Sequence, residues 1–453
     1  MSQPGTVGTA FPELARIATS FELTDDARMG AIEAIADTVT ASAAAPRFAF
    51  AKPVQDAYGV GHSAIWFTGK TASAIGAGFA NAMTSAALDL DDGHRASRGH
   101  PGAAVVPAVF AELDQLSADR KSVTDTSVLR AVAVGYEVAL RIAGAKSFYA
   151  RTGFWAGIAA AAAVGSLRKL STRKFAHALA IGAETGPHMA TTTAPPAWPQ
   201  PNGTDVKEGI PWGVVTGMAA VPLAKAGMTG PLDLVDHAPF FDVDDILAER
   251  DRPMVCESYT KFHAACRHVH GPVEAVAQLM AEHDLTWKDL REVSVEAYSG
   301  ALRIPNLHEP LTVVDAQYSI PYCIGLVALK GLGCLATMNV SDLGNKDAEA
   351  VARRVKVSVC DEFEAEFPSK TLVRVTIRTK DGELISPVTT PSGEADDRPD
   401  WSRRSDKLVA VTEASLSKAT QADLVSAMED LRTGDLTALR AQMFSHHEPP
   451  QGR

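Results

Sequence analysis

The chain has 453 residues, of which 46% are hydrophobic and 21% are charged, a composition typical of a folded globular protein with two or three domains. Its formal net charge of −11 argues against general nucleic-acid binding, which requires a basic face, so we expect no nucleic-acid partner. The five cysteines are scattered without a CxxC pair, which predicts reduced thiols and a cytoplasmic protein.

The first two hundred residues predict helices, and the N-terminal stretch lacks the pattern of a secretory signal. Thr24 is the predicted N-cap of the first clear helix, because Asp25 and Asp26 follow it in the first turn and apolar residues then recur at helical spacing. The alanine-rich run GFWAGIAAAAAVG is shorter than the roughly 20 residues that span a bilayer, so it predicts a buried helix and no membrane partner. Further helices are expected at residues 72–90, 102–118, 125–144, 173–185 and 213–227.

The pattern changes after about residue 285. REVSVEAYS, RRVKVSVCD and LVRVTIRTKDGELI alternate apolar and polar residues, which predicts a small antiparallel sheet with one buried face. The Asp381-Gly382 pair predicts a hairpin turn, and SIPYCIGLVALKG predicts a helix between the first two strands. The C-terminal residues 422–443 are again helical in pattern. The expected fold is therefore mainly α, with a smaller α+β domain.

Four polar clusters interrupt this scaffold, at residues 87–111, 146–155, 202–213 and 261–275. None contains a phosphate-binding loop, a GxGxxG after a strand or a GxSxG elbow, so nucleotide cofactors and a serine hydrolase gain no support. Asp89, Asp92, His94 and His100 have the chemistry to bind a divalent ion, yet no HExxH motif is present. Acid/base groups and anion clamps are the favoured interpretation, with neither metal nor cofactor, and a metal-dependent hydrolase is the alternative.

Six segments together resemble the MmgE/PrpD family, which includes 2-methylcitrate dehydratase, cis-aconitate decarboxylase and iminodisuccinate epimerase. They are ALDLDDGHRASRGHPGAAVVPA, KEGIPWGVVTGMAAVPLAKAGMTGP, KFHAACRHVHGPVEA, DAQYSIPYCIGLVALKG, DEFEAEFP and PSGEADDRP. The resemblance implies an all-helical domain built from both chain ends, residues 1–265 and 395–453, and an α+β lid, residues 266–394. It also implies a homodimer that needs no metal or organic cofactor.

The resemblance also implies roles for individual residues. Asp89 and His100 match the family's D-x-D-D…H-P motif, and Lys261 matches its active-site lysine. The implied catalytic residues are Asp89, His100, Lys261, Tyr149 and Lys207. The predicted substrate-binding residues are Asp92, His94, Arg98, Cys266, Arg267 and His270. For Asp91 and Asp92 the alternative is a cap of the helix that begins near Gly102, and this alternative is favoured for Asp91.

Two departures from the family pattern affect the expected substrate. Gly93 stands where the decarboxylase and many dehydratases have Thr or Ser. The G-F-H-P-T-G segment, which supplies a second histidine in the family, is shortened here to GFWAGI, with Trp155 in place of that histidine.

The family's reactions all place negative charge next to a substrate carboxylate, which requires cations or hydrogen-bond donors at the carboxylate oxygens. His100 suits proton transfer because its usual pKa lies near neutrality, and Asp89 would orient it. We therefore expect a cofactor-independent lyase or isomerase acting on a small di- or tricarboxylate, with dehydration of a citrate-like 2-hydroxy acid marginally favoured. The alternatives are an epimerase, a cis-aconitate-like decarboxylase, and a divergent member that binds carboxylates without catalysis.

Overall fold

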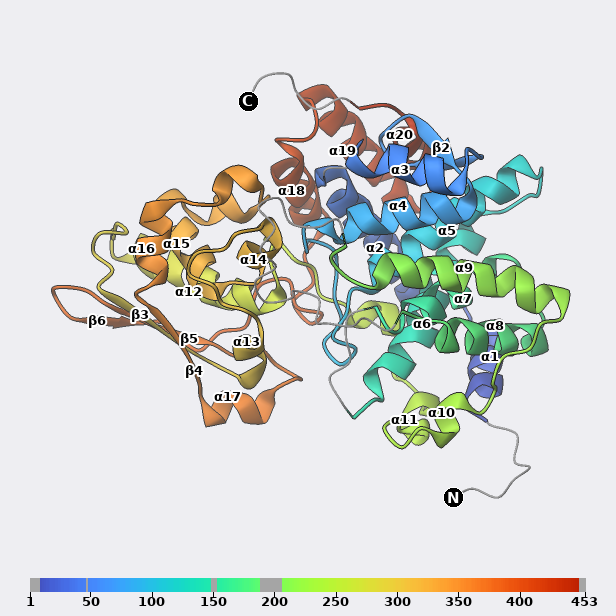
Figure 1. Cartoon of the computed structure of the whole chain (residues 1–453), viewed down its shortest axis with the longest axis horizontal. Coiled ribbons are helices and arrows are strands. Elements are labelled where there is room, and N and C mark those ends of the chain that lie inside the picture. The colour runs from blue at the N-terminus through green and yellow to red at the C-terminus, as the bar shows by residue number, and fades with distance from the viewer. Residues whose placement is uncertain (1–8, 46–47, 148–152, 188–205, 448–453) are drawn as a thin grey trace.

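The computed structural model describes residues 9–45, 48–147, 153–187 and 206–447. A large helical part and a smaller part with a sheet lie side by side (Figure 1). Buried hydrophobic residues form one core from residues 10–256 and 408–443, and a second core mainly from residues 264–377. The expected fold class is confirmed, because both chain ends contribute to the helical part. The exact domain boundaries stay a prediction.

Helices predominate in the larger part. Thr24 accepts a hydrogen bond from the backbone of Ala27 and caps α2, as predicted from the sequence. The helices from the N-terminal side are α1 (Ala10–Ser20), α2 (Asp25–Ala44), α3 (Phe48–Tyr58), α4 (Ala74–Ala87), α5 (Pro101–Ala118), α6 (Asp125–Gly144), α7 (Ala156–Leu167), α8 (Thr172–Glu184), α9 (Ile210–Ala226), α10 (Leu234–His237), α11 (Val243–Leu247) and the 3-10 helix η1 (Met254–Glu257). Two short antiparallel strands are β1 (Ser63–Ile65) and β2 (Lys70–Ala72). The C-terminal helices are α18 (Trp401–Thr412), α19 (Lys418–Thr433) and α20 (Thr437–Phe444).

Helices α7 and α9 approach closely because small residues line their contact. A Cβ atom on Gly217 would lie 2.3 Å from the carbonyl oxygen of Gly157, and one on Gly213 would lie 2.5 Å from Ala156 Cβ. Larger residues here would force the two helices apart. The contact therefore fixes the N-terminal end of α9, which follows Lys207 and Glu208 directly.

The smaller part contains a four-stranded sheet in the order β4-β3-β5-β6. Its strands are β3 (Glu292–Ala297), β4 (Val355–Val359), β5 (Arg374–Arg378) and β6 (Glu383–Ile385). The pairs β3–β5 and β5–β6 are antiparallel, with the predicted turn at Asp381-Gly382. The pair β3–β4 is parallel, which corrects the prediction of an antiparallel sheet. The reason is the long connection over residues 298–354, which carries the chain back through several helices before β4 begins.

Several helices lie in the same part of the molecule as this sheet (Figure 1). The predicted helix at 319–331 is α15, and Ser319 caps it by accepting a hydrogen bond from the backbone of Tyr322. The helices are α12 (Arg267–Glu282), α13 (Ser299–Arg303), α14 (Val313–Gln317), α15 (Ile320–Lys330), α16 (Lys346–Ala352), α17 (Asp361–Glu366), and the 3-10 helices η2 (Leu332–Leu335) and η3 (Val340–Asp342).

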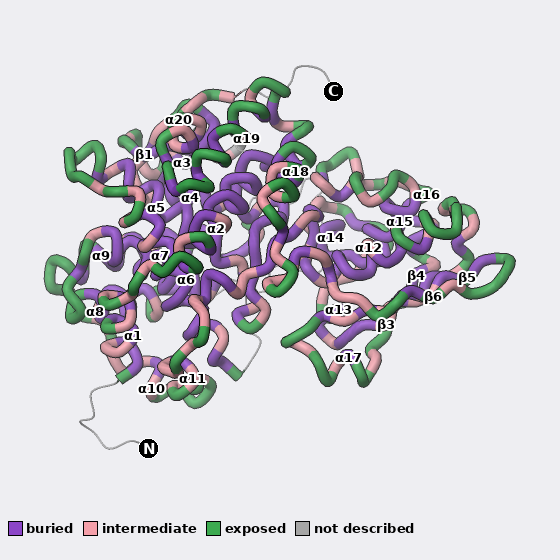
Figure 2. Tube along the Cα trace, turned by 180° about the vertical axis from the view of Figure 1, so that it is seen from behind, coloured by how far each residue is buried: buried purple, intermediate pink, exposed green. Residues whose placement is uncertain are grey.

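The two parts share buried residues where they meet. Leu88 and Leu90, which follow α4, and Val411 of α18 pack into the core of the smaller part. Figure 2 shows buried residues through the interior of both parts, with exposed residues mainly at their periphery. The polar loop after α4 is therefore held at the junction of the two cores. Within the described ranges, no helix has the length and apolar character needed to cross a membrane.

Candidate active site

A loop at residues 88–100, between α4 and α5, meets the segment that precedes α12. The backbone of Gly93 donates a hydrogen bond to the carbonyl of Tyr259 at 3.1 Å, and Tyr259 donates back to Gly93 at 2.8 Å. A further bridge inside the loop pairs His94 with Gly99. These backbone contacts bring two polar clusters, more than 160 residues apart in the sequence, into one place.

Asp89, His100 and Lys261 are in mutual contact at this junction. Lys261 Nζ donates a hydrogen bond to Asp89 Oδ1 at 2.7 Å and lies 3.2 Å from His100 Nδ1. His100 Nε2 lies 3.4 Å from Asp89 Oδ1. The backbone of Asp89 has φ = 53°, a left-handed conformation that is uncommon outside glycine and that cores tolerate mainly at functional or tightly determined positions.

Both ring nitrogens of His100 have close polar partners. Nδ1 lies 3.0 Å from the carbonyl oxygen of Asp92, which accepts a hydrogen bond, and 3.2 Å from the Lys261 ammonium, which donates one. In the tautomer with the hydrogen on Nδ1, the lone pair is on Nε2. A proton taken up there would come to lie beside the Asp89 carboxylate, which would stabilise the imidazolium.

The charges of the three groups follow from their surroundings. Burial alone would raise the pKa of Asp89, but Lys207, Lys261 and His100 hold it well below its usual value. Burial alone would lower the pKa of Lys261, but Asp89 and Asp91 raise it above its usual value. Burial and then the Lys261 charge lower the pKa of His100. At neutral pH the site therefore holds a carboxylate, an ammonium group and a neutral imidazole.

Lys207 supplies a second cation. Its Nζ donates a hydrogen bond to the carbonyl of Ala86 at 2.7 Å and lies 4.0 Å from Asp89 Oδ2. The same nitrogen lies 5.9 Å from the ring centre of Tyr318, a buried residue between α14 and α15. The pKa of the Tyr318 phenol is raised well above its usual value, first by burial and then by Asp89. Sequence reasoning missed Tyr318, although it lies in the quoted segment DAQYSIPYCIGLVALKG.

Ligand atoms of Asp89, Asp91 and His100 lie within 4.8 Å of one another, which is close enough to hold a metal ion. Lys261 Nζ, however, lies 2.7 Å from Asp89, 3.2 Å from His100 and 3.8 Å from Asp91. The positive charge at the centre of this cluster is therefore the lysine ammonium. A second group of possible ligands, His263, His270 and Glu274, contains a 3.0 Å contact between His263 and Glu274 and lies next to the cation of Arg267.

Asp92, rather than Asp91, caps α5. Asp92 Oδ1 accepts a hydrogen bond from the backbone of Gly102 at 2.9 Å, and its Oδ2 accepts one from the Tyr136 hydroxyl at 2.8 Å. The preference for Asp91 as the cap is thus wrong. Substrate binding by Asp92 stays a prediction, but both its oxygens already have protein partners. Burial and then Asp37 raise the pKa of Asp92 to about 7.

His94 and Arg98 lie in the same loop. His94 Nδ1 accepts a hydrogen bond from the backbone of Ser97, and its Nε2 lies 3.3 Å from a Glu257 carboxylate oxygen. Arg98 has φ = 53° and is half-buried, and its charge contributes to a lowered pKa of Lys146. Both residues are near the candidate site, and their predicted contacts with a substrate stay untested.

Cys266, Arg267 and His270 lie at the start of α12. Burial and then Asp89 raise the pKa of Cys266 to about 12, which opposes a nucleophilic role and fits a small pocket residue. Arg267 donates hydrogen bonds to Glu394 at 2.5 Å and to the carbonyl of Ser392 at 2.9 Å. His270 is fully buried, and its Nε2 donates to the carbonyl of Ala265 at 3.1 Å. The protein itself thus occupies much of the hydrogen-bonding capacity of Arg267 and His270.

Tyr149, the remaining predicted catalytic residue, lies outside the described residues. Lys146, at the end of the preceding segment, is buried, and burial followed by the charge of Arg98 lowers its pKa to about 8. Its Nζ lies 4.8 Å from the ring centre of Phe154.

Both departures from the family pattern have a structural counterpart. A Cβ atom on Gly93 would lie 2.3 Å from Tyr259 Cζ, so the Tyr259 ring occupies the space that a Thr or Ser side chain would need. A Cβ atom on Gly99 would lie 2.3 Å from the Trp155 ring, which is 1% exposed. Two aromatic rings therefore pack directly against the backbone of the loop and fix its path.

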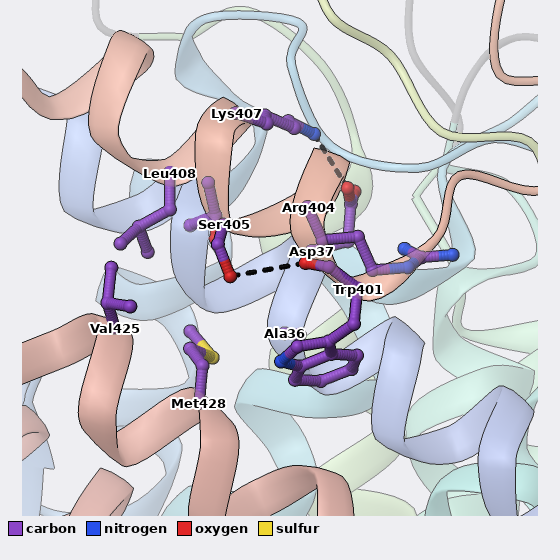
Figure 3. Close-up of a pocket in the computed structure, with 10 residues that line it drawn as sticks. Ala36, Asp37, Trp401, Arg404, Ser405, Lys407, Leu408, Val425 and Met428 are labelled. Atoms are coloured by element: carbon purple, nitrogen blue, oxygen red, sulfur yellow. Dashed lines mark hydrogen bonds and ion pairs between the residues drawn. The ribbon is translucent and has the colours of Figure 1, made fainter.

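The buried ion pair of Lys407 and Asp37 contacts the backbone of the 88–100 loop. Lys407 of α18 contacts Asp37 of α2 at 2.6 Å and also donates a hydrogen bond to the carbonyl of Leu90 at 3.0 Å. Figure 3 shows this pair beside the small pocket that α2, α18 and α19 line. Helix α18 thus helps to hold Leu90, the residue next to Asp89.

Two family models and two known proteins match most of the chain. The model of the MmgE/PrpD N-terminal domain matches residues 13–243, and that of the MmgE/PrpD C-terminal domain matches residues 263–432. A cis-aconitate decarboxylase of Aspergillus terreus is 24% identical over 401 residues, which cover 81% of this chain and 79% of that enzyme. The enzyme of the same name from Aspergillus terreus strain NIH 2624 / FGSC A1156 is 24% identical over 411 residues, covering 82% of this chain and 81% of that enzyme.

Proposed function

We propose that this chain, which belongs to the MmgE/PrpD family, is a cofactor-independent lyase that acts on a small di- or tricarboxylate. The family and the decarboxylase relatives support a lyase. The observation that carries the proposal is the neutral His100 held between Lys261 and the Asp89 carboxylate. A homodimer and a cytoplasmic location belong to the same proposal.

In the proposed mechanism, His100 Nε2 removes a proton from a substrate carbon that is next to a carboxylate. The electrons left behind spread onto the carboxylate oxygens, and the ammonium groups of Lys261 and Lys207 stabilise this charge. Lys261 acts as the cation rather than the base, because Asp89 keeps it protonated. Asp89 stabilises the protonated His100 and holds Lys261 in place.

Three reactions compete as the outcome of this chemistry. Dehydration of a citrate-like 2-hydroxy acid uses both a base and an acid, and the buried Asp91, 3.8 Å from His100, has a raised pKa. Decarboxylation of a cis-aconitate-like acid is the second candidate, and the names of the two relatives favour it. Epimerisation next to a carboxylate would use the same base. We place dehydration first.

Proton exchange in D2O, followed by NMR, tests the acid/base site directly. The acids would be citrate, 2-methylcitrate, cis-aconitate, malate, tartrate and iminodisuccinate. We expect exchange or turnover of one acid by the wild type and a loss of about 100- to 10,000-fold in His100→Ala, because general base catalysis contributes that much. The exposed His283, which follows the last residue of α12, provides the matched control variant, His283→Ala, which should behave as wild type.

Each of the other results would point elsewhere. Exchange that survives in His100→Ala would show that the base is another residue. Binding without exchange, detected as a thermal shift, would favour a divergent carboxylate-binding member. A stoichiometric amount of tightly bound zinc or manganese in the purified protein would favour the metal-dependent hydrolase.

A further inference from the structure

Glu208 is a buried acid that the mechanism above does not use. It directly follows Lys207 and precedes Gly209, the N-cap residue of α9. Its side chain is 3% exposed, and among the described residues neither of its carboxyl oxygens has a hydrogen-bond partner. A buried carboxyl group without a partner is costly for stability, so its retention calls for an explanation.

Glu208 follows Lys207, whose Nζ lies 4.0 Å from Asp89 Oδ2 in the candidate active site. Lys207, Asp91, Asp89 and Lys261 all lie close enough to influence its protonation, and Glu208 in turn contributes to the raised pKa of the Tyr318 phenol. The backbone that follows it is closely packed, because a Cβ atom on Gly153 would lie 2.5 Å from the backbone nitrogen of Ile210. Glu208 therefore lies beside the cluster of Asp89, Lys261 and Lys207, in the segment that precedes α9.

Glu208 and Asp89 have opposite protonation states within this cluster. Burial, only partly offset by Lys207, raises the pKa of Glu208 to about 8. Asp89, which contacts Lys261, remains ionised. When the surroundings of two carboxyl groups move their pKa values apart, one group is a proton donor while the other is an anion. Here Glu208 is the proton donor and Asp89 is the anion. At neutral pH Glu208 carries a proton, with no acceptor among the described residues.

We propose that Glu208 donates a proton to the leaving hydroxyl group of a hydroxy di- or tricarboxylate, which makes dehydration the reaction of this site. The inference rests on the proposed function. His100 takes the proton from the carbon next to a carboxylate, and the electron pair of that C–H bond forms the C=C bond. The C–O bond breaks with its electron pair on oxygen, and the proton of Glu208 completes the leaving water. Decarboxylation releases no hydroxyl group, so there the proton of an acid goes to the carbanion carbon and not to a leaving oxygen.

The test separates formation of the carbanion from loss of water. Glu208→Gln preserves the size of the side chain but removes its acidic proton. For the hydroxy acid that the wild type dehydrates, we expect the variant to exchange the carbon-bound hydrogen with D2O within a few-fold of the wild-type rate. Its dehydration rate should fall by about 100-fold or more.

Glu112→Gln is the matched control. Glu112 is also buried and also has a raised pKa, but it lies in the second half of α5 and pairs with Arg168. This control should keep both exchange and dehydration. Infrared spectra at pH 7 should contain a band of a neutral carboxyl group that Glu208→Gln loses and Glu112→Gln retains.

Equal loss of exchange and dehydration in a folded Glu208→Gln variant would overturn the role, as would retention of both. Absence of the infrared band would also overturn it. Wild-type exchange without dehydration of any hydroxy acid would overturn the role of Glu208 but leave the acid/base site in place. Absence of exchange and turnover with every acid would instead overturn the proposed function, and with it this role.

Discussion

At the scale of residues, the site is a set of groups that fix one another's charge. Lys261 is fully buried, and burial alone would favour its neutral form; the 2.7 Å contact with Asp89 reverses this preference. Burial, and then the same ammonium 3.2 Å away, lower the pKa of His100 and keep it neutral. The Asp89–Lys261 pair thus both stabilises a cation for the substrate and keeps the base ready to accept a proton.

The pH dependence of kcat/KM should reflect this arrangement. A protonated imidazole cannot accept a proton, so activity should fall on the acid side with a midpoint below 6.5, the usual pKa of histidine, because the pKa of His100 is lowered. On the alkaline side activity should fall near pH 8, where Glu208 loses its proton. In Glu208→Gln the residual activity should lack the alkaline fall. An unchanged alkaline limb in that variant would assign it to another group.

The stability of the protein should depend on the Asp89–Lys261 pair. Lys261→Met leaves the buried Asp89 with only the more distant Lys207 and the neutral His100, so the free energy of unfolding should fall by about 3–5 kcal/mol. In Asp89→Asn/Lys261→Met both charges are absent, and part of that loss should be recovered. Urea unfolding of the two single variants and the double variant measures this coupling. Strictly additive effects would contradict it.

At the scale of elements, the loop at 88–100 owes its path to two aromatic rings that pack on glycines. Gly93→Ala should reduce the free energy of unfolding by about 1–3 kcal/mol, because its Cβ would lie 2.3 Å from Tyr259 Cζ. Exchange activity should fall as well, since Asp89 and His100 flank this point. In a Tyr259→Leu background the same substitution should have little effect on stability. An equal cost in both backgrounds, measured by urea unfolding, would show that the ring is not the obstacle.

The sequence predicted most elements but not how they meet. Thr24 and the helical spacing after it identified α2, and the alternation in residues 292–297 identified β3. The direction of β4 could not be predicted, because alternation is the same in parallel and antiparallel strands and the 298–354 connection decides it. Asp89, His100 and Lys261 were named together through the family resemblance. Tyr318 and Glu208 were missed as site residues, because their approach to Asp89 depends on how α9 and the smaller part pack.

At the scale of the whole molecule, one carboxylate ties the two parts together. Glu394, in the segment before α18, accepts hydrogen bonds from Arg95 of the 88–100 loop at 2.8 Å and from Arg267 of α12 at 2.5 Å. Both arginines also lie over the Tyr259 ring, at 5.9 Å and 4.5 Å from its centre. The loop that bears Asp89 is therefore linked to the first turn of α12 through Glu394, and to the segment before α12 through Lys261.

Removing the charge of Glu394 should weaken the contact between the 88–100 loop and α12 more than it lowers kcat. Glu394→Gln leaves two guanidinium groups close together, so the free energy of unfolding should fall by about 1–3 kcal/mol, less than for a fully buried pair because the carboxylate is 16% exposed. Amide hydrogen exchange should increase in residues 88–100 and at the start of α12, and KM should rise more than kcat falls. Glu383→Gln, which breaks an exposed pair with Arg378 at the sheet edge, should cost less than about 1 kcal/mol. If the two variants have equal effects on stability and on exchange at the junction, Glu394 does not hold the two parts together, and the contact of Lys261 with Asp89 alone must align the site.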